Sequence, residues 1–171
     1  EKEVSIRSAM EAISVLSSKY NVDLIELNFS NFSNFVNKIK YGSLVFNLLH
    51  GGEGENGQIQ SFLSQCGVLY TGSGPEASMI AMNKNNTKII ANYNNILSPN
   101  WICLNIKNIK TYTIDSNVKI KYPVVVKPNS EGSTLGLTIV YNKDEMSNAI
   151  KIASKFSDEI IIEQFIKGRE V

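Results

Sequence analysis

The sequence is poor in several residues on which common site chemistries depend. Its 171 residues include only two cysteines, Cys66 and Cys103, and a single histidine, His50. Two cysteines in apolar contexts are too few for a disulfide framework or a cysteine-rich metal cluster. We therefore expect both thiols to be reduced, as is usual in cytosolic proteins.

Long apolar runs and an excess of one charge are lacking as well. Apolar runs such as residues 160–162 are far shorter than the roughly 20 residues that a membrane span needs. The 17 basic and 16 acidic residues give a net charge of +1, so no general field attracts nucleic acid or anionic lipid. These two features lead us to expect neither nucleic-acid nor membrane partners. Residues 1–5 are mostly polar, so we expect no signal peptide and a cytoplasmic location.

The first half of the chain shows a regular alternation of predicted helices and strands. We expect a helix capped by Ser5, a strand over 23–27 and a helix over 32–39. The near-continuous apolar run at 43–49 is typical of a strand buried on both faces of a parallel sheet. Further expected elements are a helix over 58–66, a strand over 68–70 and a helix over 76–82. This rhythm predicts an α/β domain over residues 1–74.

The second half has a different pattern, in which strands pair as hairpins and helices cover one side. The pattern predicts helices over 84–93 and 143–156, and strands over 101–106, 123–127, 137–141 and 159–165. Such an arrangement is typical of an α+β domain, which we place at residues 75–163. Residues 164–171 then begin a further domain.

A glycine-rich segment, residues 50–57 (His-Gly-Gly-Glu-Gly-Glu-Asn-Gly), follows the predicted buried strand and precedes a helix. That position is the carboxyl edge of a parallel sheet, where ligands bind in open α/β folds. Glycines permit close approach of the backbone, and a helix N-terminus favours an anion. The alternative is a connecting loop with a solvated His50.

Two lysines are placed where an anion would stabilise them. Lys127 ends a buried apolar strand, which is costly for a cation without a partner. The loop after it, residues 128–136, holds two glycines and three hydroxyl side chains that can fold over phosphates. Lys84 lies at a predicted helix start, where the helix dipole is positive. The alternatives are a hairpin tip and solvated lysines.

A third segment begins at Glu163, which closes the apolar strand at 160–162. The end of a strand offers backbone donors and acceptors to an adenine edge, and a carboxylate can accept from a ribose hydroxyl. An ordinary strand end is the alternative.

Taken in order, five segments resemble the D-alanine–D-alanine ligases of the ATP-grasp superfamily. They are residues 1–5 (Glu-Lys-Glu-Val-Ser), 49–57 (Leu-His-Gly-Gly-Glu-Gly-Glu-Asn-Gly), 70–74 with 82–84 (Tyr-Thr-Gly-Ser-Gly and Met-Asn-Lys), 126–136 (Val-Lys-Pro-Asn-Ser-Glu-Gly-Ser-Thr-Leu-Gly), and 162–165 with 168–171 (Ile-Glu-Gln-Phe and Gly-Arg-Glu-Val). Their shared order over the whole chain carries the resemblance. It implies an α/β protein with a Rossmann-like N-terminal domain, an α+β ATP-grasp central domain, and a C-terminal catalytic domain that is largely absent.

The resemblance implies an ATP-dependent ligation of two D-alanines through an acyl phosphate, for peptidoglycan precursors. Phosphoryl transfer depends on positive charge and positioning more than on covalent catalysis. Lys84 and Lys127 match the family lysines that hold the ATP phosphates. The loop residues Glu131, Gly132, Ser133 and Thr134 match the flap that closes over them. The remaining implied nucleotide contacts are Glu163 at the ribose, Gln164 and Ile166 at the adenine, and Glu170.

The resemblance also implies residues for the first D-alanine. Glu1 matches the acid that fixes its ammonium group, Ser133 matches a serine hydrogen-bonded to that acid, and His50 lies nearby. Two Mg²⁺ ions are implied, but their ligands in the family lie far beyond Glu163. We therefore expect no metal ligands in this chain and no activity from it alone. A homodimer is implied too.

Two other interpretations stay open. One is an ATP-grasp ligase that makes a D-alanyl-D-lactate depsipeptide or another product, because the choice of nucleophile is made mainly outside this chain. The other is a non-catalytic nucleotide-binding module. The presence of Glu1, Ser133 and His50 argues against that module, since nucleotide binding alone needs none of them.

Overall fold

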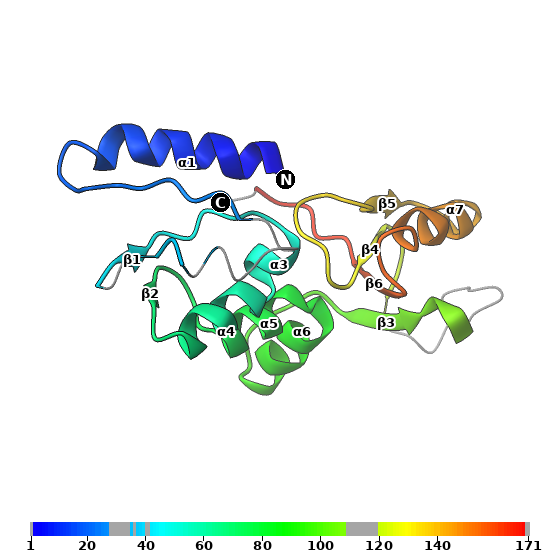
Figure 1. Cartoon of the computed structure of the whole chain (residues 1–171). Coiled ribbons are helices and arrows are strands. Elements are labelled where there is room, and N and C mark those ends of the chain that lie inside the picture. Colours follow the sequence, from blue (N-terminus) through cyan, green and yellow to red (C-terminus); the bar gives the residue numbers. More distant parts are fainter. Residues whose placement is uncertain (1, 28–34, 36, 40–41, 109–119, 170–171) are drawn as a thin grey trace. The chain divides into compact units, whose positions relative to one another are not determined.

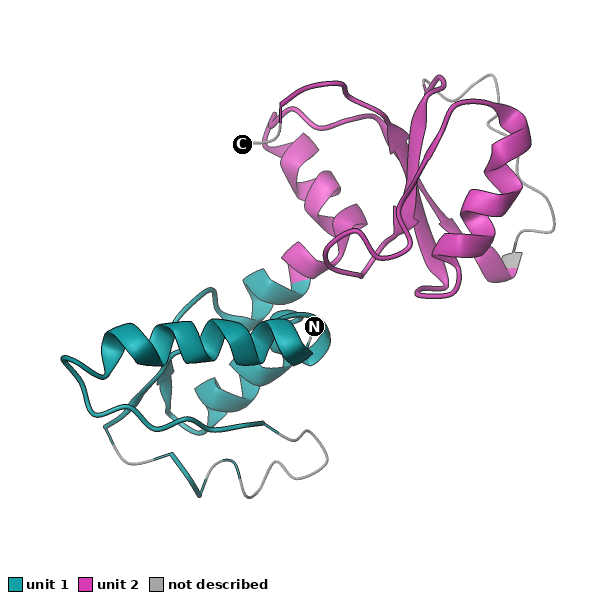
Figure 2. Ribbon diagram, turned by 90° about the horizontal axis from the view of Figure 1, so that it is seen from above, with its two compact units in different colours: residues 1–79 teal, residues 80–171 magenta. Residues whose placement is uncertain are grey.

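The computed structural model describes residues 2–27, 35, 37–39, 42–108 and 120–169 (Figure 1). The chain divides into two compact units, residues 1–79 and 80–171 (Figure 2). This boundary falls inside helix α5 (Pro75–Met82), a little after the domain boundary predicted at residue 74. Pro75 begins α5, where its fixed φ and missing N–H are well tolerated.

In the part of unit 1 that the structure describes, helices accompany a short parallel strand pair, β1 with β2, in which Leu44 faces Leu69 and Val45 faces Tyr70. Its elements are α1 (Lys2–Leu16), β1 (Leu44–Val45), α3 (Gly52–Glu55), α4 (Gln58–Gln65), β2 (Leu69–Tyr70) and most of α5. Gly67 follows α4 with φ +66°, the left-handed conformation expected just after a helix.

The core of unit 1 is built around one face of α4. Ile59 and Leu63, four residues apart on that helix, are buried together with Phe35. Partly buried side chains from other segments pack against this cluster, among them Val45, Leu49, Val68 and Tyr70. The two strands therefore lie against α4, as a helix packed on a sheet requires.

Three sequence predictions for unit 1 are wrong. Helix α1 begins at Lys2, so Ser5 lies inside it, and the Ser5 hydroxyl accepts from the backbone N–H of His50 at 2.9 Å instead of capping. Residues 23–27 form no strand. Strand β1 is much shorter than the predicted 43–49: residues 46–49 belong to no strand, and Leu49 N donates to the side-chain oxygen of Asn47 at 3.1 Å instead of to a neighbouring strand. Of the helix predicted over 32–39, half lies outside the described residues, and residues 37–39 form a turn and a bend.

Unit 2 is built on a four-stranded sheet in the order β3–β6–β4–β5, with every neighbouring pair antiparallel. Its elements are α6 (Lys84–Tyr93), β3 (Trp101–Asn105), the 3₁₀ turn η2 (Ile106–Asn108), β4 (Val124–Pro128), β5 (Thr138–Val140), α7 (Lys143–Ala153) and β6 (Glu159–Gln164). The sequence predictions for these strands and helices are confirmed closely, including the β4–β5 hairpin.

Alternation along the strands gives this sheet two different faces. One face is apolar: Val124, Val126, Ile160 and Ile162 form the unit's core with side chains of α7. The other face carries the charged residues of the sheet, because Lys127 pairs directly with Ile161, and Glu163 with both Val125 and Trp101.

Helices lie on both sides of this sheet, α7 on one and α6 on the other (Figure 2). The prediction that helices cover one side only is therefore wrong. Helix α6 contacts the charged face, where Trp101 Nε1 donates to Asn85 Oδ1 at 2.9 Å. The charged face is thus enclosed between a sheet and a helix, which positions the site described below.

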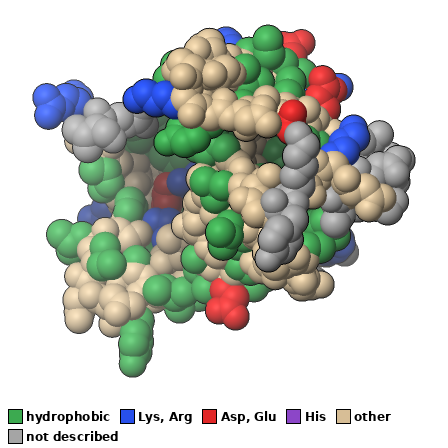
Figure 3. All heavy atoms as spheres, turned by 60° about the vertical axis from the view of Figure 1, so that its left-hand side comes forward, with side chains coloured by type: hydrophobic (Ala, Val, Ile, Leu, Met, Phe, Trp, Pro, Cys, Tyr) green, Lys and Arg blue, Asp and Glu red, His purple; other side chains and the backbone are tan. Residues whose placement is uncertain are grey.

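The surface mixes side-chain types. On the face drawn in Figure 3, hydrophobic side chains lie among other residues, with a few acidic and basic ones between them. Within the part of the chain that the structure describes, no helix combines the length and apolarity that crossing a bilayer requires.

Candidate functional site

A pocket of about 300 Å³ opens in unit 2 on the charged face of the sheet. It is lined by Lys84, Lys88, Lys127 and Glu163, with Ala81, Thr87 and Pro99. Three lysines meet one carboxylate, so the pocket carries surplus positive charge. A concave site with such charge attracts an anionic ligand.

Helix α6 supplies two of the lysines, and its first turn is held in place by polar contacts. Asn83 caps the helix, accepting from Asn86 N at 2.9 Å. The fully buried Asn129, just after β4, accepts from Lys84 N through its carbonyl at 3.0 Å. Its side-chain oxygen accepts from Asn85 N at 2.9 Å. These bonds use N–H groups that a helix start leaves without intrahelical partners.

Glu163 lies at the centre of the lysines, and only 7% of it is exposed. Its Oε1 accepts a short hydrogen bond from Lys127 Nζ, and its Oε2 pairs with Lys88 Nζ at 2.7 Å. Burial by itself raises the pKa of Glu163, but the hydrogen bonds and charges of Lys127 and Lys88 outweigh it and hold that pKa below the usual value. Glu163 is therefore a carboxylate at neutral pH.

Lys88 is a site residue that the sequence predictions missed. It is 8% exposed, and besides Glu163 its Nζ donates to Ser98 Oγ at 2.9 Å and to Pro99 O at 3.3 Å. Its Nζ lies 5.3 Å from the ring centroid of Trp101, a favourable cation–π distance. One signal was available: Lys84 and Lys88 are four residues apart, and such like-charged pairs destabilise a helix unless another group compensates them.

Lys84 is the lysine whose charge is least compensated. Its Nζ donates a short hydrogen bond to the backbone carbonyl of Glu131, a neutral acceptor. Burial lowers the pKa of Lys84 and the charge of Lys127 lowers it further, while Glu131 and Glu163 act in the opposite direction. An anion bound beside Lys84 and Lys127 would relieve their mutual repulsion.

The loop after β4 carries the other predicted phosphate contacts. Its first part is held by the Lys84–Glu131 contact, and Glu131 and Gly132 are half-buried, whereas Ser133 and Thr134 are exposed. At its end Gly136 has φ +69°, and a Cβ there would lie 2.8 Å from Phe156 Cδ2. Only glycine fits that position. The loop is therefore anchored at both ends and exposed at its tip.

The end of β6 carries the predicted adenine contacts. The Gln164 side chain bonds twice to the backbone of Lys121: Gln164 Nε2 donates to Lys121 O at 3.1 Å, and Gln164 Oε1 accepts from Lys121 N at 3.3 Å. The backbone N–H of Gln164 donates to Asn100 O at 2.9 Å. Ile166, two residues on, is 64% exposed. Gln164 therefore uses its side chain to hold the strand end.

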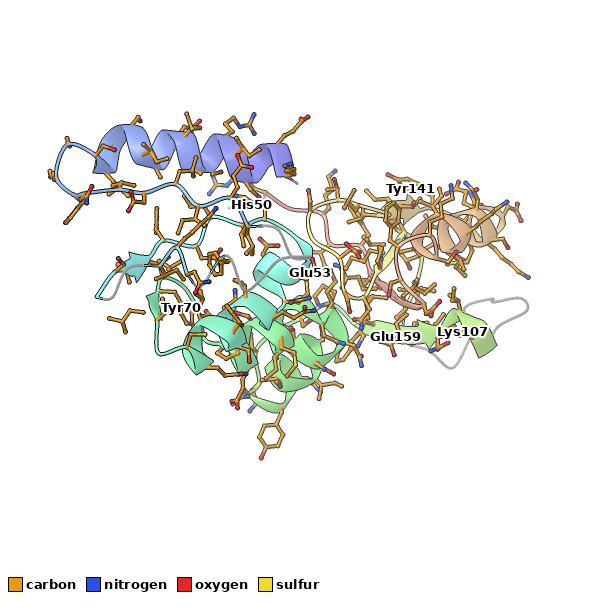
Figure 4. All side chains as sticks on the ribbon, viewed as in Figure 1. His50, Glu53, Tyr70, Lys107, Tyr141 and Glu159 are labelled. Atoms are coloured by element: carbon orange, nitrogen blue, oxygen red, sulfur yellow. The ribbon has the colours of Figure 1, made fainter. Side chains whose placement is uncertain are left out.

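The predicted substrate residues are not brought together by the described contacts. His50 belongs to unit 1 and is exposed beside α1, with Nε2 3.3 Å from Ser8 Oγ and Nδ1 4.0 Å from Glu55 Oε1 (Figure 4). Ser133 belongs to unit 2. Glu1 and Glu170 lie outside the described residues. The grouping of Glu1, His50 and Ser133 thus stays a prediction, as does Glu170 as a nucleotide contact.

Metal ligands were not expected in this chain. Among the described residues, no group of three or more His, Cys, Asp or Glu side chains is arranged to hold a metal ion.

Comparison with known proteins gives consistent results. Residues 90–171 match the family model described as D-ala D-ala ligase C-terminus. The whole chain is 35% identical over 171 residues to D-alanine–D-alanine ligase A of Bacillus cereus, of which it covers 56%. The crystal structure of D-alanine–D-alanine ligase from Bacillus anthracis matches 98% of this chain at 38% identity with a TM-score of 0.87, over 54% of that protein.

A second Bacillus anthracis structure, of D-alanine–D-alanine ligase complexed with ATP, matches 98% of this chain and 55% of its own at 36% identity, with a TM-score of 0.84. The chain thus spans about half the length of the relatives that it matches. Sequence similarity over all 171 residues and structural similarity over nearly all of them agree. Over its whole length this chain is therefore similar in sequence and structure to D-alanine–D-alanine ligases.

Proposed function

We propose that the protein containing this chain joins two D-alanines to D-alanyl-D-alanine with ATP, for peptidoglycan precursor synthesis. The observation that carries the proposal is the lysine-lined pocket of unit 2, which has surplus positive charge beside a glycine-bearing loop. The carboxylate of the first D-alanine attacks the γ-phosphate, which gives an acyl phosphate and ADP. The amine of the second D-alanine then displaces inorganic phosphate and forms the peptide bond.

In this proposal Lys84 and Lys127 bind the ATP phosphates. Charge that spreads over phosphoryl oxygens in the transition state is stabilised by fixed cations more than by covalent partners. Lys84 suits this role because its present acceptor is a neutral carbonyl. A charged phosphate oxygen in its place would form a stronger hydrogen bond with the ammonium group. Lys127 suits it because it lines the same pocket.

The loop residues Glu131, Gly132, Ser133 and Thr134 form the proposed flap over the phosphates. Anchored ends and an exposed tip are the features that a closing loop needs, since the tip moves while the ends keep their place. Closure over the nucleotide would exclude water, which otherwise hydrolyses an acyl phosphate.

The nucleoside part is assigned to the end of β6. Gln164 and Ile166 are proposed at the adenine, and Glu170 as a further nucleotide contact. The contacts of Glu163 support a different role from the ribose contact predicted for it, because both of its oxygens are already engaged by lysines. We assign Glu163 to the positioning of Lys127.

The finer fold and substrate assignments are part of the proposal. Unit 1 is proposed as the Rossmann-like N-terminal domain and unit 2 as the ATP-grasp central domain. Glu1, His50 and Ser133 are proposed to bind the first D-alanine. A cytoplasmic homodimer is proposed on family resemblance. Magnesium is proposed as the accompanying ion, but the described residues offer no ligand cluster for it, so no step is assigned to it here.

The test is a product assay on the full-length protein. Incubation with ATP and D-alanine is expected to release phosphate and ADP together with D-alanyl-D-alanine, detected by mass spectrometry. L-alanine serves as the control substrate and should give no product. D-lactate added in competition separates the alternatives: a depsipeptide as the only product, or no ATP-dependent product at all, would overturn the proposed function.

A further inference from the structure

We propose that Lys88 is a positioning residue of the nucleotide site: it neutralises Glu163 and thereby leaves the charge of Lys127 available to the phosphates. The inference rests on the proposed function, because it concerns how the same pocket binds ATP. It adds a residue that acts through others and does not itself touch the nucleotide.

The contacts of Lys88 show why it does not serve as a phosphate ligand. An ammonium group has three hydrogens to donate. Lys88 Nζ donates to Ser98 Oγ at 2.9 Å and to Pro99 O at 3.3 Å, and it forms an ion pair with Glu163 Oε2 at 2.7 Å. Its side chain is only 10% exposed. A ligand in the pocket would therefore meet a lysine whose donors are already used.

The charges of the pocket show what Lys88 does instead. Glu163 holds Lys127 with one oxygen and Lys88 with the other. If Lys88 were neutral, Glu163 and Lys127 would cancel each other, and only Lys84 would remain to face a phosphate. With Lys88 in place the carboxylate is already neutralised, so both Lys84 and Lys127 contribute to anion binding. A carboxylate shared by two lysines also fixes the direction of Lys127.

The packing around Lys88 is suited to this role. The ring of Trp101 lies 5.3 Å from the ammonium group and is itself held by Asn85 of the same helix. Lys88 thus connects α6 to β3 and β6 through charge, ring and hydrogen bonds. A residue held in so many ways can keep its partner within the narrow tolerance that a phosphate site needs.

The test uses Lys88→Met in the full-length protein, in the wild-type background and in Glu163→Gln. Calorimetric titration with ATP measures the dissociation constant of each variant at a temperature where each is folded. Lys88→Met alone is expected to weaken ATP binding on the order of tenfold, within the coupling found for residues of one ion-pair network. In the Glu163→Gln background the same change should alter affinity about twofold or less, as for independent sites.

Lys107→Met is the matched control, because Lys107 is an exposed lysine whose partner is Asp158, away from the pocket lining. It should bind ATP like the wild type, and the KM for D-alanine should not change in Lys88→Met. Should Glu163→Gln fail to fold, carbon NMR titration of the Glu163 carboxyl in Lys88→Met provides the second measurement. The pKa of Glu163 should rise when Lys88 is lost.

The outcomes separate the two claims. If the wild type does not bind ATP, both the proposed function and this inference are overturned. If the wild type binds ATP but Lys88→Met binds equally well, or loses as much affinity in the Glu163→Gln background, the inference alone is overturned. An unchanged Glu163 pKa in Lys88→Met would have the same effect.

Discussion

Replacing Glu163 by glutamine should destabilise the protein strongly, although the substitution keeps the side-chain volume. Glu163 is 7% exposed and is the shared partner of Lys88 and Lys127. Glutamine keeps a hydrogen-bond acceptor but removes the negative charge. Two lysines would then be left in the site without a counter-charge, and a buried charge without a partner raises the free energy of the folded state.

The size of the destabilisation depends on how well each lysine can replace its lost contact with the carboxylate. Removing one partner of a buried ion pair costs about 3–5 kcal/mol. Lys88 would remain buried but would keep Ser98 Oγ, Pro99 O and the Trp101 ring. The side chain of Lys127 is 20% exposed and can turn towards water. We therefore expect the lower end of that range, about 3 kcal/mol in the free energy of unfolding.

The assay is urea unfolding of the full-length protein, followed by far-ultraviolet circular dichroism. The urea concentrations at the transition midpoints are compared. If the slope of the unfolding free energy against urea concentration is unchanged, a shifted midpoint reports a change in stability. Asp158→Asn is the control: it removes the partner of Lys107 from a pair that is 71% and 52% exposed, and it should stay close to the wild type. A Glu163→Gln protein that also stays close to the wild type would refute the charge balance described for the pocket.

Three further predictions concern the same unit. Lys127→Ala should raise the KM for ATP and slow turnover, because phosphate charge is then less compensated; unchanged kinetics would remove Lys127 from the site. The contribution of Glu163 to stability should be full above the ordinary glutamate pKa of 4.5 and be lost as the pH falls through its lowered folded-state pKa. Acid unfolding of Glu163→Gln should lack this component, and identical pH profiles would contradict it. Gly136→Ala should destabilise by about 1–2 kcal/mol through its positive φ and its contact with Phe156. Gly168→Ala, where an added Cβ meets nothing within 4 Å, is its control, and equal melting temperatures for the two variants would contradict the strain.

Much of unit 2 could be predicted from the sequence. Runs of β-branched residues such as Pro-Val-Val-Val-Lys strongly favour a strand, and pairing with the next strand through a hairpin needs little long-range information. Asn142 caps α7 by accepting from Asp144 N and Glu145 N, a signal that is likewise local. The elements of this unit accordingly begin and end close to their predicted residues.

Unit 1 was harder to predict because its segments depend on tertiary contacts. The apolar run 43–49 has the composition of a buried strand, but only two of its residues form one, and Leu49 N bonds to the Asn47 side chain instead of to a strand neighbour. Residues 23–27 have a strand-like composition, and Ile25 and Leu27 pack against the α4 cluster without joining a sheet. Composition indicates that such residues are buried but not which backbone conformation buries them.

The sequence alone indicated the resemblance to one family and the residue types of the candidate site, because motif order and charge can be read along the chain. Lys84, Lys127 and Glu163 could be selected as unusual from local position alone. Only the tertiary structure decided how they combine, since residues far apart in sequence become neighbours through strand pairing and helix packing. The pairing of β4 with β6 sets Lys127 beside Glu163, and α6 adds Lys88 as the second partner of that carboxylate. Charge balance in a buried pocket depends on such neighbours, and distance along the chain does not reveal them.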